Sequence, residues 1–142
     1  MVKKKSYLFF STIAIILVID QLSKYLVKKG IIEIPFILNS GSLWGLFQNS
    51  AIILAWLSVL VIGIFLFNYD KIQKSPLLVR LGAGLIVGGA IGNLIDRILY
   101  KGVVDFINLG WWPSFNVADS GVSLGVTLLI FYFLFEEKFK RK

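Results

Sequence analysis

The chain has 142 residues, of which 57% are hydrophobic and 16% are charged, and its formal net charge is +7. Soluble domains usually have about 25% charged residues, so this composition argues against an ordinary water-soluble globule, and its high hydrophobicity argues against a disordered chain. The sequence has no cysteine and no histidine, which excludes disulfides, thiolate nucleophiles, Ser-His-Asp triads and HExxH zinc sites. Any catalysis must therefore depend on carboxylates, lysine, arginine, tyrosine or hydroxyl groups.

Four apolar segments are each long enough to cross a bilayer, for which a helix needs about 20 predominantly apolar residues. The first contains only two charges, Asp20 and Lys24, and the stretch from 34 to 69 contains none. Pro76 directly precedes the third segment, which suits a helix start. The predicted spans are residues 6–27, 51–68, 77–99 and 117–135.

The distribution of basic residues predicts the orientation of these spans. An even number of spans places both termini on one side, and that side carries ten Lys and Arg residues against five on the other. The positive-inside rule then places both termini in the cytoplasm. Because the basic residues flank apolar spans and form no single patch, we expect contacts with anionic lipid and no nucleic-acid partner. The prediction is an all-α integral membrane protein with one domain over 1–142 and extracytoplasmic loops at about 28–50 and 100–116.

Glycines recur at four-residue spacing in the third and fourth segments, at Gly84, Gly88 and Gly92 and at Gly121 and Gly125. Small residues at this spacing let helix backbones approach closely in lipid. The pattern predicts a compact bundle and says nothing about its function.

Four acidic residues, Asp20, Asp96, Asp105 and Asp119, lie toward the predicted outer face, at the ends of spans. Charged groups within a span are costly and suggest a functional role or a partner. Asp20 and Lys24 are four residues apart and share a helix face, so they are placed to pair. A boundary ion pair and a substrate-side role both remain open for them.

Asn93, Asp96 and Arg97 occupy one face of the third predicted helix. The guanidinium of Arg97 is suited to bidentate contact with a carboxylate or a lipid phosphate. Structural and binding roles both remain open for this group.

Asp105 and Asp119 each lie among apolar neighbours, in Val103–Phe106 and Phe115–Asp119. Such surroundings disfavour the charged carboxylate. If the fold brings the two together, they would share one proton, as in aspartic proteases, where one carboxylate activates water and the other polarises the scissile carbonyl. Spacing alone leaves the alternative of two unrelated interface acids.

Motifs in four parts of the chain together resemble those of bacterial lipoprotein signal peptidase, also called signal peptidase II. Any one motif is weakly specific, whereas the ordered set is highly specific and covers nearly the whole chain. The matching segments are Asp20-Gln21-Leu22-Ser23-Lys24, Asn39-Ser40-Gly41 with Trp44-Gly45-Leu46-Phe47, residues 88–97 with Val103-Val104-Asp105-Phe106, and Phe115-Asn116-Val117-Ala118-Asp119-Ser120.

The resemblance implies a membrane aspartyl endopeptidase that cleaves prolipoproteins just before a lipobox cysteine carrying diacylglyceryl. It implies that Asp105 and Asp119 form the catalytic dyad, and that no metal or cofactor takes part. We expect a monomer in the bacterial inner membrane, surrounded by membrane lipids, with its active site near the extracytoplasmic face. The residues that the resemblance implies to support the site or position substrate are Asp20, Lys24, Asn39, Gly41, Asn93, Asp96, Arg97 and Asn116.

The resemblance also implies a small extracytoplasmic β-cradle and a short interfacial helix, supplied by residues 28–50 and 100–116. Trp44, Trp111 and Trp112 would then lie at the outer interface, which favours indole rings. One departure from the family pattern is the bulkier Ser42-Leu43-Trp44 that follows the Asn-x-Gly loop.

Three other functions are compatible with parts of the sequence. A small proton- or cation-coupled transporter would use Asp20 or Asp96 as a relay. A Ser/Lys peptidase would use Ser42 or Ser120 with Lys24. A structural or assembly subunit would explain the glycine pattern but not the settings of the acids.

Overall fold

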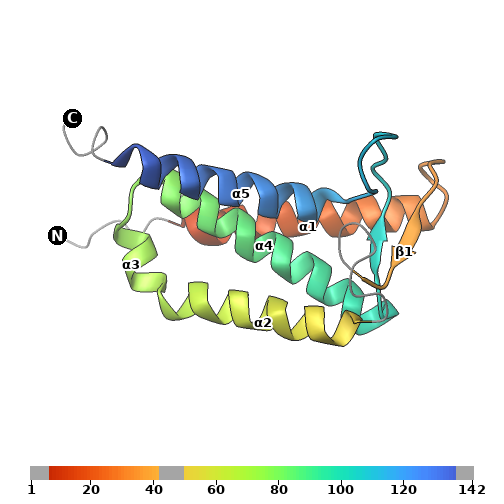
Figure 1. Cartoon of the computed structure of the whole chain (residues 1–142), viewed down its shortest axis with the longest axis horizontal. Coiled ribbons are helices and arrows are strands. Elements are labelled where there is room, and N and C mark those ends of the chain that lie inside the picture. The colour runs from red at the N-terminus through yellow and green to blue at the C-terminus, as the bar shows by residue number, and fades with distance from the viewer. Residues whose placement is uncertain (1–6, 42–49, 137–142) are drawn as a thin grey trace.

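The computed structural model describes residues 7–41 and 50–136, which form a mostly helical chain with one small sheet (Figure 1). This confirms the helical class predicted from the sequence. The short helix α3 was not predicted; it has Asp70 in its first turn and lysines in its last turn, which complements the helix dipole. The elements in chain order are α1 (Leu8–Lys28), β1 (Ile37–Asn39), α2 (Ala51–Phe67), α3 (Tyr69–Lys74), α4 (Leu77–Tyr100), β2 (Val103–Asp105) and α5 (Val117–Leu134).

Within the described residues, α1, α4 and α5 are long and apolar enough to cross a membrane. Helix α2 is as apolar but has 17 residues. Its outward-facing side chains include Ile52, Trp56 and Phe67, which are 70%, 69% and 91% exposed. Exposed apolar side chains of this size are expected where a helix faces lipid.

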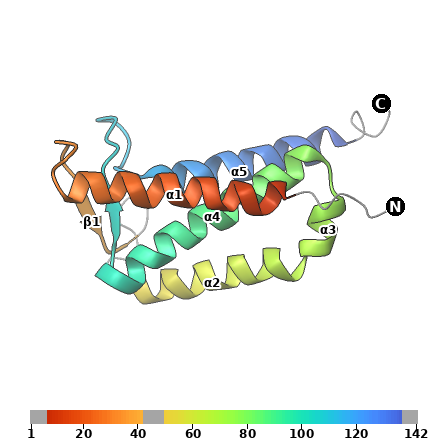
Figure 2. The same cartoon turned by 180° about the vertical axis from the view of Figure 1, so that it is seen from behind.

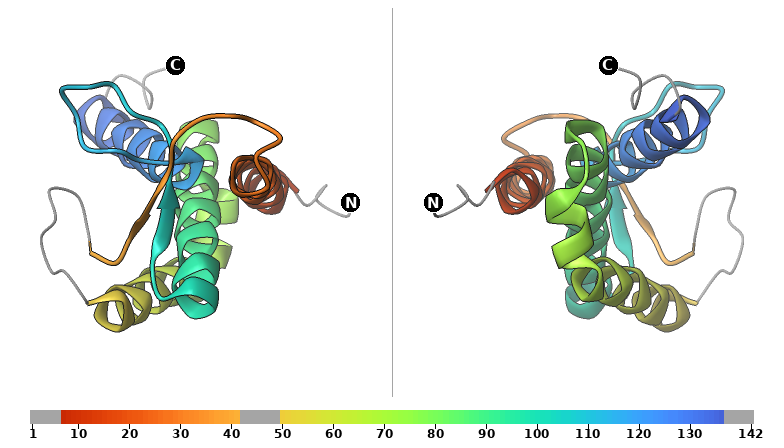
Figure 3. Two further views of the ribbon diagram at one scale, coloured as in Figure 1. Left: turned by 90° about the vertical axis from the view of Figure 1, so that its right-hand side faces the viewer. Right: turned by 90° about the vertical axis from the view of Figure 1, so that its left-hand side faces the viewer.

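Helix α4 is the central helix and packs against α1, α2 and α5, which lie around it when the molecule is viewed end-on (Figure 3). Glycines allow these close contacts. A Cβ atom on Gly125 would lie 2.6 Å from the backbone oxygen of Gly82, and one on Gly92 would lie 2.6 Å from Oδ2 of Asp20. Helix α2, in contrast, contributes no buried residue and stands apart from α1 and α5 (Figures 1 and 2).

The sheet lies at one end of the bundle, opposite the start of α1 and the end of α5 (Figures 1 and 2). Strands β1 and β2 are antiparallel, with Leu38 opposite Val104 and Asn39 opposite Val103. β2 is fully buried, whereas β1 is mostly exposed and covers it. The pairing brings two extended segments about 65 residues apart in sequence to the ends of α1, α4 and α5.

The loops at this end contain the two-stranded sheet that the β-cradle prediction calls for, plus an isolated bridge between Ile107 and Phe115. The chain reverses from α4 into β2 through Lys101, whose φ of 57° is left-handed. The rings of Trp111 and Trp112 pack edge to face in the second loop, with centroids 5.7 Å apart. Residues 42–49, where the predicted interfacial helix, Trp44 and the Ser42-Leu43-Trp44 departure fall, lie outside the described residues.

Candidate active site

Asn116 links the two acids singled out in the sequence, Asp105 on β2 and Asp119 on α5. Its side-chain Nδ2 donates to Oδ1 of Asp105 at 2.8 Å. Its backbone N–H donates to Oδ2 of Asp119 at 3.2 Å, and its Oδ1 accepts from the backbone N–H of Asp119 at 2.9 Å. The last two bonds form a capping box at the start of α5. One fully buried asparagine therefore both starts the helix and holds the two carboxyl groups together.

Asp119 lies in the first turn of α5, where unpaired backbone N–H groups favour negative charge. Its Oδ1 also accepts a hydrogen bond from Nδ2 of Asn93 at 2.7 Å. Asn93 is buried on α4, and its Oδ1 accepts from Asn116 and from Lys24, each at 3.1 Å. Asn93 thus links Asp119 and Asn116 to the buried lysine.

Asp105 is buried at the end of β2, 3% exposed. Its Oδ2 accepts from Nδ2 of Asn39 on the paired strand at 2.9 Å. Burial raises the pKa of Asp105 to about 6; the nearby Asp119 carboxylate adds to the rise, while hydrogen bonds from Asn39 and Asn116 oppose it. Asp105 therefore keeps its proton to a higher pH than an ordinary aspartate does.

Lys24 lies at the centre of a second buried polar cluster, which adjoins these two acids through Asn93. Its Nζ contacts Oδ2 of Asp20 at 2.7 Å and Oδ2 of Asp96 at 3.0 Å, in addition to Asn93. The pairing of Asp20 with Lys24 expected from the sequence is present, and Asp96 is a second partner. Three oxygens occupy the three donors of this ammonium, so it is not free to act as a base for a serine nucleophile.

Backbone N–H groups supply further hydrogen bonds to the buried carboxylates of Asp20 and Asp96. The N–H of Ala118 on α5 donates to Oδ1 of Asp20 at 2.8 Å, and the N–H of Val104 on β2 donates to Oδ2 of Asp96 at 3.0 Å. The cluster therefore joins α1, α4, β2 and α5 into one polar core, which a buried charge in an apolar bundle requires.

Gln21 also belongs to this cluster, although it was not among the site residues chosen from the sequence. Its Nε2 lies 3.1 Å from Oδ2 of Asp20, 3.2 Å from Oδ1 of Asp96 and 3.2 Å from the backbone oxygen of Gly92. The signal was its place next to Asp20 within the first motif.

Gly41 and Arg97 lie at the edge of the site. The N–H of Gly41 donates to Oδ1 of Asn39 at 3.0 Å, a local turn that orients the Asn39 amide toward Asp105. Arg97 is half-buried, and its guanidinium makes no hydrogen bond within residues 7–41 and 50–136. It borders a groove of about 260 Å³ between α2, α4 and α5, together with Asn93 and Asp119.

The remaining lining of this groove is mostly apolar. It includes Leu57 and Val61 from α2, Ile86 and Ala90 from α4, and Val122 from α5. The polar end of the groove, which holds a carboxylate and an arginine, thus continues into an apolar part beside α2.

The Ser/Lys peptidase alternative finds no support in the geometry of the described residues. The hydroxyl of Ser120 donates to the backbone oxygen of Asn116 at 3.1 Å, and Lys24 is engaged elsewhere, so these two do not form a Ser/Lys pair. Ser42 lies outside the described ranges. No three acidic side chains in 7–41 and 50–136 converge as metal ligands would.

Structural comparison places this arrangement among membrane enzymes. A bacterial membrane enzyme solved at 2.3 Å resolution superposes with a TM-score of 0.82 at 25% identity, covering 94% of this chain and 91% of the other. A second bacterial membrane enzyme, solved at 1.9 Å, gives a TM-score of 0.76 at 26% identity, covering 89% and 92%.

Sequence comparison identifies the family. The profile of signal peptidase (SPase) II matches residues 12–135. Lipoprotein signal peptidases of Halothermothrix orenii and Syntrophomonas wolfei are each 36% identical, covering 91% and 92% of this chain and 97% and 95% of theirs. That of Listeria monocytogenes serotype 4a is 36% identical over 93% of this chain and 96% of its own. The chain belongs to the signal peptidase II family, aspartic peptidases of the membrane that remove signal peptides from lipoprotein precursors.

Proposed function

We propose that Asp105 and Asp119 are the catalytic dyad and that the enzyme cleaves its precursor just before a diacylglyceryl-modified cysteine. The observation that carries this is the bridging of both carboxyl groups by Asn116 at the polar end of an apolar groove. Two carboxyl groups held together share a proton, which supplies a base and an acid at the same site.

The environments of the two acids suggest their roles. Asp119, at the positive end of α5, acts as the carboxylate that takes a proton from the attacking water. Asp105 holds the shared proton and donates a hydrogen bond to the carbonyl oxygen of the scissile peptide. As water adds to the carbonyl carbon, the proton on Asp105 passes to the developing oxyanion and gives a diol. When the C–N bond then breaks, Asp119 gives its proton to the leaving nitrogen and Asp105 takes one back from a hydroxyl of the diol, which leaves a carboxyl product.

The polar residues around the dyad keep it in this geometry. Asn39, Asn93 and Asn116 donate to the carboxyl oxygens, and Gly41 shapes the turn that presents Asn39. Lys24, with Asp20 and Asp96, anchors Asn93 from behind. Arg97, which borders the groove beside Asp119, positions the substrate by contact with a peptide carbonyl or a lipid oxygen.

The groove offers a substrate that is held in the bilayer a route to the dyad. Helix α2 packs mainly on α4, and a groove between α2, α4 and α5 leads to Asp119. A signal peptide entering from the lipid along this groove brings its scissile bond to the polar end. Because a lipid anchor confines the substrate to the membrane plane, few sequence-specific contacts are required.

We propose that the chain crosses the bacterial inner membrane four times as a monomer, with both termini in the cytoplasm and the dyad toward the outer face. The 17 residues of α2 rise about 25 Å, and spans as short as about 17 residues occur. The spans are those predicted, in one domain over 1–142, with the sheet and the dyad at the extracytoplasmic end.

The test is cleavage of a defined prolipoprotein, with and without its diacylglyceryl group, by the purified enzyme in detergent. We expect cleavage of the lipidated form only, and a loss of at least about 10³-fold in Asp105→Asn and Asp119→Asn. Lys71→Gln, a charge change on exposed α3, should cleave normally. Retained activity in either aspartate variant would remove that residue from the dyad. Failure to cleave either substrate by folded wild-type protein would favour the transporter hypothesis.

A further inference from the structure

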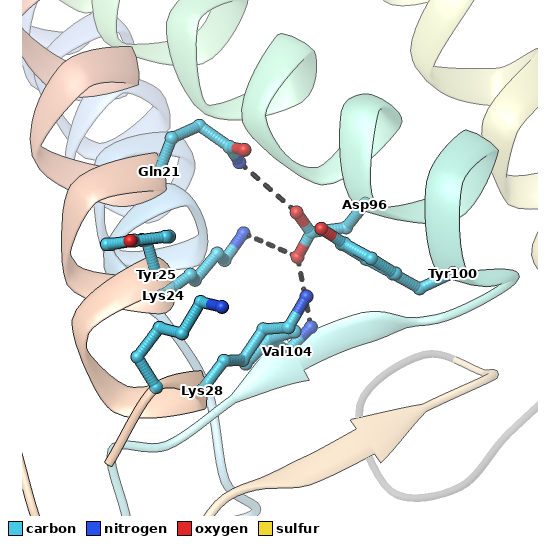
Figure 4. Close-up of a pocket in the computed structure, with 8 residues that line it drawn as sticks. Gln21, Lys24, Tyr25, Lys28, Asp96, Tyr100 and Val104 are labelled. Carbon is cyan, nitrogen blue, oxygen red and sulfur yellow. Dashed lines mark hydrogen bonds and ion pairs between the residues drawn. The ribbon is translucent and has the colours of Figure 1, made fainter. Parts of the chain in front are cut away.

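A second cavity, of about 510 Å³, lies at the outer ends of α1 and α4 beside strand β2. It shares only α4 with the groove that holds Asp119. Figure 4 shows side chains of α1, α4 and β2 around it. Its open part is lined by Tyr25, Lys28, Lys29 and Tyr100. The dyad does not use any of these four residues.

The floor of this cavity carries no unsatisfied negative charge. The acid that lines it in the described part of the chain is Asp96. Its Oδ1 accepts from Gln21, and its Oδ2 accepts from Val104 and contacts Lys24 (Figure 4). The charge of Asp96 is therefore committed to its neighbours and does not neutralise cations at the mouth.

Lys28 and Lys29 place two uncompensated cations at that mouth. Neither forms a salt bridge within residues 7–41 and 50–136. Nζ of Lys28 lies 3.3 Å from the ring centroid of Tyr100, and Nζ of Lys29 lies 5.9 Å from that of Tyr25. An aromatic face orients a cation without cancelling its charge. The cavity thus presents two held ammonium groups to an incoming anion.

An apolar strip of α1 leads from this cavity toward the middle of the membrane. Val18, Leu22, Tyr25 and Lys29 follow one another at helical spacing, and the first three are 62%, 53% and 54% exposed. From Val18 to Lys29 the helix rises about 16 Å, close to half of a hydrocarbon core about 30 Å thick. The strip therefore matches the length of one acyl chain in one leaflet.

We propose that this cavity binds the phosphate group of an anionic phospholipid, with Lys28 and Lys29 as its ligands and an acyl chain along Val18 and Leu22. The two ammonium groups match a phosphodiester. The apolar strip favours a lipid over a free phosphate, because a free phosphate has no acyl chain to pack against it. This site is independent of the dyad, so it stands whether or not the cleavage mechanism above is correct.

The test measures lipid retained by the purified full-length protein. Delipidated enzyme is incubated with equal amounts of phosphatidylglycerol and phosphatidylethanolamine, exchanged into detergent, and examined by native mass spectrometry. We expect wild-type protein to retain phosphatidylglycerol selectively. The double variant Lys28→Gln/Lys29→Gln should retain at least about tenfold less phosphatidylglycerol than wild type. Lys71→Gln/Lys74→Gln, which removes the same charge from α3, should retain as much as wild type.

Several outcomes would overturn the proposal. Equal retention of the two lipids, or equal loss in the α3 variant, would show that the cavity has no specificity for the anion. If glycerol phosphate displaces the bound phosphatidylglycerol as effectively as added lipid does, the cavity is a site for free phosphate. If the glutamine variant does not fold, Lys28→Arg/Lys29→Arg and Tyr100→Leu replace it: the first should retain the lipid and the second should lose it, and the opposite pattern would contradict the site.

Discussion

At the scale of single residues, the active site depends on amides as much as on acids. Asn39, Asn93 and Asn116 together donate to three of the four carboxyl oxygens of Asp105 and Asp119 through their side chains. An amide can donate and accept at once without adding charge, which suits the proposed sharing of a proton between the two acids. Lysines in the same places would fix both acids as anions.

The pH dependence of cleavage follows from the raised pKa of Asp105. An ordinary aspartate is mostly charged above about pH 4, whereas Asp105 stays mostly protonated up to about pH 6. If Asp105 is the acid, kcat/KM falls as the pH rises through its pKa. The hydrogen bond from Asn39 lowers this pKa, so Asn39→Ala should move the alkaline limb to higher pH. A pH profile with the limb unmoved, or with the acidic limb displaced instead, would contradict the assignment of Asp105 as acid.

The two tasks of Asn116 are separable by substitution. Serine at this position keeps an N-cap oxygen but has no amide to reach Asp105 and Asn93. We expect Asn116→Ser to unfold within a few degrees of wild type and to lose about 10-fold or more in kcat. Asn116→Ala should lose the cap as well, and about 1 kcal/mol of stability with it. Full activity in the serine variant would show that the bridge to Asp105 is dispensable.

The charged residues of the site and Asn93 could be chosen from the sequence, because charged and amide side chains within or at the ends of apolar spans are conspicuous. Asn39, Gly41 and Asn116 were chosen only because the motifs that contain them resemble those of the family. The sequence did not predict the backbone partners of the acids. The N–H groups of Ala118 and Val104 that satisfy Asp20 and Asp96 are backbone donors, and any residue other than proline supplies one. Such bonds depend on where β2 and the start of α5 lie, which is a property of the fold.

At the scale of elements, the apolar runs predicted the helical class because their length is set by the membrane. The pairing of β1 with β2 could not be predicted from a residue pattern, because strands of three residues are too short to show the alternation of apolar and polar residues typical of a strand. Helix α3 was missed for a similar reason: six residues between Asn68 and Ser75 form less than two turns.

Close contact between α1 and α4 should be sensitive to a single methyl group. In Gly92→Ala the new Cβ would lie 2.6 Å from Oδ2 of Asp20, a buried oxygen that cannot move without breaking its contact to Lys24. We expect a loss of about 1–3 kcal/mol, measured by thermal unfolding in detergent. Gly63→Ala on α2 is the matched control, since nothing lies within 4 Å of its added carbon, and it should be neutral or stabilising. Equal effects of the two substitutions would contradict the packing argument.

At the scale of the whole molecule, the sheet and the dyad lie at one end of the bundle and α3 lies at the other (Figure 1). The native chain has no cysteine, so single exposed cysteines report the side of the membrane cleanly. Glu33→Cys should react with an impermeant maleimide from outside intact spheroplasts, and Lys74→Cys only after the membrane is opened. The reverse result would invert the proposed topology, and labelling of both from outside would reduce the number of spans.

The pairing of Asp20 with Lys24 within one helix has a consequence for how the protein is made. Helix α1 leaves the ribosome before α4 and α5, and the 2.7 Å contact between these side chains lets it enter the bilayer with its own counter-ion. The other partners of that pair come with α4 and then with Ala118 on α5. Asp119 also arrives on this last helix. With the dyad proposed above, a nascent chain carries only Asp105 until α5 is synthesised, and we expect that it cannot yet cleave lipoprotein precursors that are inserting beside it.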